Sequence, residues 1–238
     1  MHERAEMKLR VGLLAAVAAA FLAGCATTTP QAPVSLRFGL FAEPGLRVGV
    51  AMSKLPKVDT RFPGAEDWPL SLAAATVANS ALTAHTRTLP ADDLAHLKGE
   101  IAEALKLRGQ VPVVIDEPIA VNELPKAKGD VRNGAARDFS SLQSKYKLDK
   151  LLVVEWTEAG ISRPYSSYVP TGEPKGIVSG MSYIVNLKDN SYEWYLPVSQ
   201  QKSAHGNWDE APGFPGLSNA FYQAIEAAHD AILQPLAR

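Results

Sequence analysis

The stretch that decides the fold is residues 150–198, KLLVVEWTEAGISRPYSSYVPTGEPKGIVSGMSYIVNLKDNSYEWYLPV. Residues 150–161 open with Leu-Leu-Val-Val, which is apolar on both faces and predicts a central strand. Residues 177–187 alternate between apolar and polar side chains. Asp189-Asn190 then predicts a tight turn into a third strand, in which Tyr192 and Trp194 share one face and Tyr195 projects the other way. The three strands form a meander.

The elements on either side of this meander alternate between strand and helix patterns. Strands are expected at 46–52, with 36–40 as the other strand able to start the main sheet, and at the edge segment 111–115. Helices are expected at 71–85, 92–108, 139–146 and 217–232, the first of them alanine-rich and packed in the interior. The order is therefore strand-helix-helix-strand-helix-strand-strand-strand-helix. It predicts an α/β fold, a mixed sheet of about five strands with helices packed against it.

Composition limits the possible functions. Hydrophobic residues make up 46% and charged residues 21% of the 238 residues, which is typical of a folded domain. The formal net charge of −1 and the scattered lysines and arginines argue against a nucleic-acid partner. With one cysteine, the chain cannot form an internal disulfide or a multi-cysteine metal site. That cysteine needs another purpose.

The amino terminus supplies the purpose. Residues 11–21, VGLLAAVAAAF, form an apolar run that is too short to span a bilayer and follows Lys8 and Arg10. The cleaner positive segment MKLR at 7–10 leaves open a translation start at Met7 instead of Met1. These features predict a signal peptide over 1–24, a flexible tether over 25–34 that is rich in threonine and proline, and one globular domain over 35–238.

The residues Leu22-Ala23-Gly24-Cys25 resemble the lipobox of bacterial lipoproteins. The resemblance implies cleavage after Gly24, transfer of diacylglycerol to the Cys25 thiol, and acylation, commonly with palmitate, of the new amino group. Ala26, where an inner-membrane lipoprotein would carry aspartate, implies sorting to the outer membrane. Two or three acyl chains anchor a protein stably, whereas one chain anchors it only marginally. The expected location is therefore the periplasmic face of the outer membrane.

A second resemblance covers roughly the last hundred residues. The segment SLQSKYKLDKLLVVEWTEAG at 141–160, a glycine-flanked strand, and VNLKDNSYEWYLPVSQQ at 185–201 before a terminal helix resemble the curli-secretion-channel and TolB-N-terminal-like periplasmic lipoproteins. This likeness rests on the order of elements and implies a fold. Because the chain offers no long amphipathic membrane hairpins, we do not expect it to form a channel.

No catalytic, cofactor or metal motif emerges from the sequence. Glu155 and Glu158, three residues apart on a strand, should face opposite ways. His205, Asp209 and Glu210 gather around Trp208 in a loop that could hold a cation or simply face water. The connection 163–172, RPYSSYVPTG, is expected to present Tyr165 and Tyr168, although it could also fold back over its own sheet. Tyr165, Tyr168 and Trp208 are thus the candidate partner-binding residues.

These features predict a membrane-anchored periplasmic lipoprotein that acts as a binding or assembly module of the cell envelope, without an enzymatic activity. Its partner would be an envelope protein, a second copy of the chain, or a wall polymer. The alternative is a lipid-anchored periplasmic hydrolase of cell wall or polysaccharide. Its acids would come from Glu155, Asp209 or Glu210, two of which would have to face one cleft.

Overall fold

The computed structural model describes residues 31–129 and 131–237. The chain divides into two compact units, Met1–Ala32 and Pro33–Arg238, and all the helices and strands described below lie in the second. The predictions for the signal peptide, Gly24 and Cys25 lie outside the described residues. Val34 already belongs to the fold, because its backbone pairs with Tyr195 in an antiparallel bridge.

The sheet is mixed, as the sequence predicts. Its strands run in the order β3-β1-β4-β7-β8, and β2 pairs with the far end of β4. The bounds are β1 Arg47–Met52, β2 Asp59–Arg61, β3 Val111–Val114, β4 Lys150–Ser162, β7 Lys175–Asn186 and β8 Ser191–Ser203. β1 lies parallel to β3 and β4, whereas β4, β7 and β8 form the predicted antiparallel meander. The strand with Pro112 is at the edge of the sheet, where a missing N–H donor costs least.

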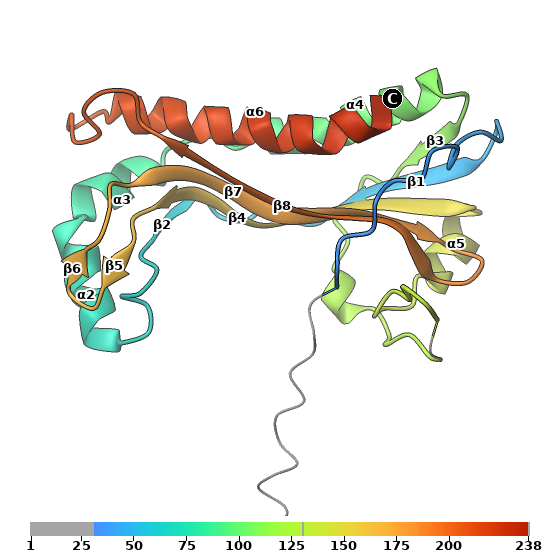
Figure 1. The fold of residues 1–238 in the computed structure, drawn as a ribbon, viewed down its shortest axis with the longest axis horizontal. Coiled ribbons are helices and arrows are strands. Elements are labelled where there is room, and N and C mark those ends of the chain that lie inside the picture. The colour runs from blue at the N-terminus through green and yellow to red at the C-terminus, as the bar shows by residue number, and fades with distance from the viewer. Residues whose placement is uncertain (1–30, 130, 238) are drawn as a thin grey trace, which may run out of the picture. The chain divides into compact units, whose positions relative to one another are not determined.

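Two helices cover one face of the sheet. Figure 1 shows α4 (Asp93–Leu107) and α6 (Pro215–Ala237) along this face. Their apolar stripes, with Leu97 and Ile101 on α4 and Phe221 and Ile232 on α6, join the largest buried cluster of the protein. α6 approaches β7 so closely that a Cβ at Gly176 would lie 2.4 Å from the Phe221 nitrogen. Both predicted helices are confirmed, and Gly176 is the residue that lets α6 pack against the sheet.

Among the residues that the structure describes, those that cover the opposite face lie at its two ends. At one end, α5 (Ser140–Tyr146) and the segment with the short 3-10 helix η1 (Val121–Glu123) enclose a second cluster around Phe139 and Tyr183. At the other, α2 (Pro69–Ala78), α3 (Ser80–Thr86) and the small hairpin β5–β6 (Tyr165–Ser166, Val169–Pro170) lie next to β2. Phe62, Ala65, Ala75 and Tyr165 form a third, smaller cluster there.

Two β-bulges overturn predictions about which side chains share a face. In β4 the register shifts between Trp156 and Glu158, so Thr157 is an extra residue, and strand alternation places Glu155 and Glu158 on the same face. In β8 the register shifts at Glu193: Tyr192 and Tyr195 join the second cluster, while Trp194 joins the first. The predicted common face of Tyr192 and Trp194 is therefore wrong, because one extra residue reverses the alternation.

The predicted helix over 71–85 is two helices, α2 and α3, which meet at Asn79. Its expected interior packing is also wrong for α2. This helix buries Ser71 and Ala75 but leaves Leu70 and Val77 about three-quarters exposed, at 75% and 76%. A surface helix normally turns its larger apolar side chains inward. In α2, Leu72 packs against the third cluster, whereas Leu70 and Val77 point to solvent.

Candidate functional site

The β5–β6 hairpin lies in the predicted partner-binding loop, but its two tyrosines have different environments. Tyr165 is 8% exposed and packs edge-on against Phe62, with 5.8 Å between the ring centroids. Its hydroxyl accepts a hydrogen bond of 2.7 Å from the Asn79 side-chain amide. Tyr168, at the hairpin tip, is 58% exposed. The expectation that both tyrosines are presented is therefore wrong for Tyr165, which is a core residue, and holds for Tyr168.

Trp208 is held in place within the fold. Its indole packs against the first cluster, and the Arg163 guanidinium lies 4.6 Å from the ring centroid. Arg163 also donates a hydrogen bond of 2.6 Å to the Asn79 side-chain oxygen. Asn79 is buried at the α2–α3 junction. Its hydrogen bonds with Tyr165 and Arg163 connect this junction to the hairpin and to the side chain that packs on Trp208. This network gives α2 and the hairpin a fixed backing.

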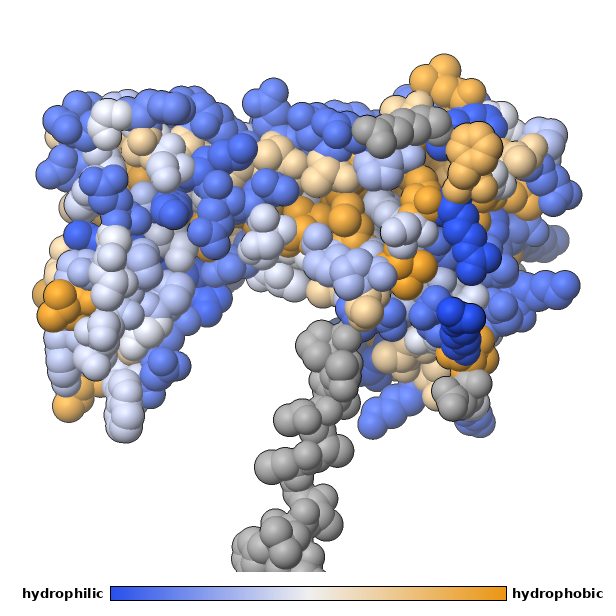
Figure 2. Space-filling model, in the orientation of Figure 1, coloured by the Kyte–Doolittle hydropathy of each residue, from blue (hydrophilic) through white to orange (hydrophobic). Residues whose placement is uncertain are grey.

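Near this backing lie five exposed large hydrophobic residues, which together we call the α2 patch. It consists of the exposed large hydrophobic residues of the α2 region and the hairpin tip: Trp68, Leu70, Val77, Tyr168 and Val169. Their exposed fractions lie between 58% and 76%. Figure 2 shows hydrophobic residues at the surface of this end of the folded unit. The sequence does not predict this patch, because the alanine-rich pattern of residues 71–85 indicates a helix packed in the interior. Leu70, Ala73, Ala74 and Val77 share one helical face, a spacing that could have revealed it.

A second candidate lies on the incompletely covered face of the sheet. Tyr183 donates a hydrogen bond of 2.6 Å to the Glu155 carboxylate, and its ring stacks on Tyr195 with centroids 5.9 Å apart. Burial raises the pKa of Glu155 above its usual range, although the hydrogen bond from Tyr183 acts in the opposite direction. Burial also raises the pKa of Tyr192 to about 12. The Glu155 carboxyl therefore stays protonated to a higher pH than the carboxyl of an exposed glutamate.

The carboxylates of the hydrolase alternative are not gathered around Glu155. Asp209 and Glu210 are exposed. Their neighbour Trp208 packs against the first cluster, on the face of the sheet opposite Glu155, so they do not lie beside Glu155. Glu158 shares the Glu155 face, but Arg61 lies 3.5 Å from its carboxylate. Within the described ranges, no three His, Cys, Asp or Glu residues are grouped so that they could hold a metal ion.

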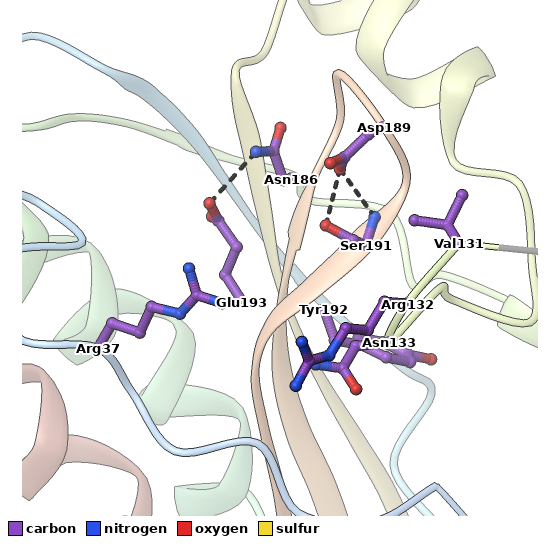
Figure 3. Close-up of a pocket in the computed structure, with 9 residues that line it drawn as sticks. All are labelled: Arg37, Val131, Arg132, Asn133, Asn186, Asp189, Ser191, Tyr192 and Glu193. Carbon is purple, nitrogen blue, oxygen red and sulfur yellow. Dashed lines mark hydrogen bonds between the residues drawn. The ribbon is translucent and has the colours of Figure 1, made fainter.

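A polar pocket of about 430 Å³ lies between Arg37, the 131–133 segment and the start of β8 (Figure 3). Its acids are already engaged. The Asp189 carboxylate accepts from the backbone N–H and hydroxyl of Ser191, and Glu193 accepts from Asn186 and pairs with the buried Lys150 ammonium. Arg37 and Arg132 are the cationic side chains that line the pocket. Sequence reasoning missed it, because the lining comes from three segments far apart in the chain.

Comparison with known proteins found structural likenesses alone. No family model and no curated protein sequence matches the chain. Among solved structures, the PelC dodecamer from Paraburkholderia phytofirmans is 11% identical, with a TM-score of 0.39 over 87% of this chain and 95% of that one. The lipoprotein GNA1162 from Neisseria meningitidis is 14% identical, with a TM-score of 0.33 over 77% and 96%. Protein XCC0632 from Xanthomonas campestris is 10% identical, with a TM-score of 0.35 over 84% and 92%.

No helix in the part of the chain that the structure describes combines the length and hydropathy needed to span a bilayer.

Proposed function

We propose that the chain is a lipoprotein of the bacterial cell envelope, anchored through acylated Cys25 to the periplasmic face of the outer membrane, and that it serves there as a binding or assembly module. The observation that carries this proposal is the sequence Leu22-Ala23-Gly24-Cys25 directly after an apolar run of signal-peptide length. Only a short stretch then separates Cys25 from Val34, the first residue paired with the sheet.

The anchor is tested by Cys25→Ser in cells fed labelled palmitate. Wild-type protein should take up the label and sediment with the membranes, because a thiol is the acceptor that the lipobox requires. The variant should carry no label and stay unprocessed or soluble. Matched variants at nearby non-acceptor positions, such as Thr27→Ser, should behave like wild type. A correctly cut, membrane-retained Cys25→Ser protein would exclude the anchor.

Contact with a further envelope component is assigned to the α2 patch. Of the three residues that the sequence singles out for binding, Tyr165 and Trp208 are engaged within the fold, and Tyr168 has its side chain free. Tyr168 lies on the same support as Trp68, Leu70 and Val77. An exposed group of large apolar side chains on a rigid backing is typical of an interaction surface.

A lipid-anchored hydrolase is the second candidate, and Glu155 is the specific observation that favours it. Burial raises the pKa of the Glu155 carboxyl, and a raised pKa is the direction of change that a general acid requires. Glu158, on the same face, would supply the second carboxylate. Under this candidate, Glu155→Gln abolishes hydrolysis of peptidoglycan or polysaccharide. Under the binding candidate, the same variant has no such effect because wild-type protein hydrolyses neither.

A further inference from the structure

One side of α2 exposes apolar residues to solvent in the described part of the chain. Ser71 is 1% exposed and Ala75 is 2% exposed, while the larger Leu70 and Val77 on the same helix point to solvent. The first turn has no acidic residue and the last turn no basic residue, so no charged side chain interrupts the outward face. A helix of this kind is stable in the isolated folded unit because its inner face and Asn79 fix it. Its outer face is apolar and exposed.

The composition of the patch favours a lipid surface over a protein groove. The exposed aromatic residues are Trp68, two positions before Leu70 in the sequence, and Tyr168, which directly precedes Val169. Tryptophan and tyrosine are enriched where a bilayer meets water, because their rings are apolar and their N–H or O–H groups remain hydrated. A helix that lies in this interface buries its apolar face shallowly among the headgroups, and here the rest of the protein covers the polar side.

The position of the patch agrees with this reading. In Figure 1, the described chain begins on the side of the sheet away from α4 and α6, and α2 and the hairpin extend on the same side. The nine steps from Cys25 to Val34 can span at most roughly 30 Å when fully extended. That reach is shorter than α6, whose 23 residues extend about 35 Å. An anchor on Cys25 would therefore keep this side of the folded unit within about one helix length of the bilayer.

We propose that the α2 patch is a second membrane contact, in which Trp68, Leu70, Val77 and the hairpin tip enter the interface of the bilayer that the Cys25 anchor occupies. The inference rests on the proposed anchor. It assigns the patch to lipid and gives the folded unit a fixed orientation on the membrane. Glu66 and Asp67 directly precede Trp68, so the contact should not depend on anionic lipids.

The test uses the full-length lipidated protein in phosphatidylcholine vesicles with and without brominated acyl chains. Bromine quenches tryptophan fluorescence only at short range. The chain has four tryptophans. Trp156 and Trp194 are 4% and 3% exposed, Trp208 is packed under Arg163, and Trp68 is 66% exposed. Brominated lipid should quench the wild-type protein, and Trp68→Phe should lose most of that quenching.

Variants then separate the patch from the anchor. Leu70→Ser with Val77→Ser should reduce the quenching of Trp68, while the protein still floats with the vesicles through its lipid. The matched control is Leu107→Ser, since Leu107 is 90% exposed at the end of α4 on the other face of the sheet and should have no effect. Melting curves confirm that each variant is folded.

Three results would overturn the inference. The first is vesicle-bound protein that shows no quenching, and the second is quenching that persists in Trp68→Phe. The third is oligomers in detergent that the Leu70→Ser, Val77→Ser variant dissociates, which would assign the patch to a second copy of the chain. Failure of the anchor itself gives a different result, because the wild-type protein would then not float with the vesicles.

Discussion

Replacing the two hairpin tyrosines separately tests the division between core and surface at this end of the fold. Tyr165 in β5 and Tyr168 in the following turn lie three residues apart in the same hairpin and have the same side chain. They differ in burial, at 8% and 58% exposed. Tyr165→Ala removes a buried ring that packs on Phe62 and Ala75, and it leaves the amide of Asn79 without its hydroxyl acceptor. Tyr168→Ala removes only exposed surface.

The magnitudes follow from these contacts. Deleting a buried aromatic ring costs about 3–5 kcal/mol of unfolding free energy. For a domain of this size each kcal/mol shifts the melting temperature by about 2–4 °C, so Tyr165→Ala should lower it by roughly 6–20 °C. Tyr165→Phe keeps the ring and loses one hydrogen bond, which costs about 1 kcal/mol. Tyr168→Ala, as an exposed substitution, should stay within about 0.5 kcal/mol of wild type.

Thermal unfolding followed by circular dichroism measures all three variants, and a denaturant titration gives the free energies. The expected order of stability is Tyr168→Ala, then Tyr165→Phe, then Tyr165→Ala. If Tyr165→Ala melts with the wild-type protein, Tyr165 is not part of the core, and the support assigned to the α2 patch is wrong. A large loss in Tyr168→Ala would show that the hairpin tip is packed.

Three further predictions follow from the anchor, the chain start and Glu155. Ala26→Asp should move the lipidated protein from the outer to the inner membrane on a sucrose gradient; unchanged density would contradict the sorting signal. A chain that starts at Pro33 should melt like the mature protein, whereas one that starts at Phe38 loses the Val34–Tyr195 bridge and should melt lower; equal melting of the two would show that the bridge contributes nothing. The pKa of Glu155 is raised in the folded protein, so its stabilising contribution is complete below the unfolded pKa, near 4.5, and is lost as the pH rises through the folded value. Glu155→Gln should therefore raise the melting temperature more at pH 7 than at pH 4.5, and a pH-independent difference would exclude a raised pKa.

The sequence predicts the architecture well because the apolar residues of each large element repeat with the period of a helix or a strand. The Leu-Leu-Val-Val start of β4 marks a strand buried on both faces, and β4 is the central strand of the sheet. The stripes of α4 and α6 predict which sides of these helices are buried. These signals are local and repeated, so one exceptional residue does not cancel them. The α/β class and the order of the main elements depend on such signals.

The candidate sites depend on single residues, and there the sequence is a weaker guide. Strand alternation assigns faces correctly only until an extra residue enters, and Thr157 and Glu193 are such residues. One signal of the first bulge is visible in the sequence: Gly180 lies inside the strand over 177–187, and glycine inside a strand often marks a close approach of backbones. In the structure a Cβ at Gly180 would lie 2.2 Å from the Glu155 carbonyl oxygen. Nothing comparable marks Glu193.

The α2 region shows why burial cannot be read from apolar content alone. Alanines are the most frequent residues of both α2 and the buried face of α6, yet α6 covers the sheet and α2 faces outward. The two helices differ in the surface against which each one packs. α6 meets the apolar face of β7 and β8 in the first cluster, whereas α2 meets the small third cluster, which takes up Ala75 and part of Leu72. Leu70 and Val77 lie on another side of the helix and are left exposed. An apolar surface kept there by the packing of the fold itself is available for a lipid bilayer to cover.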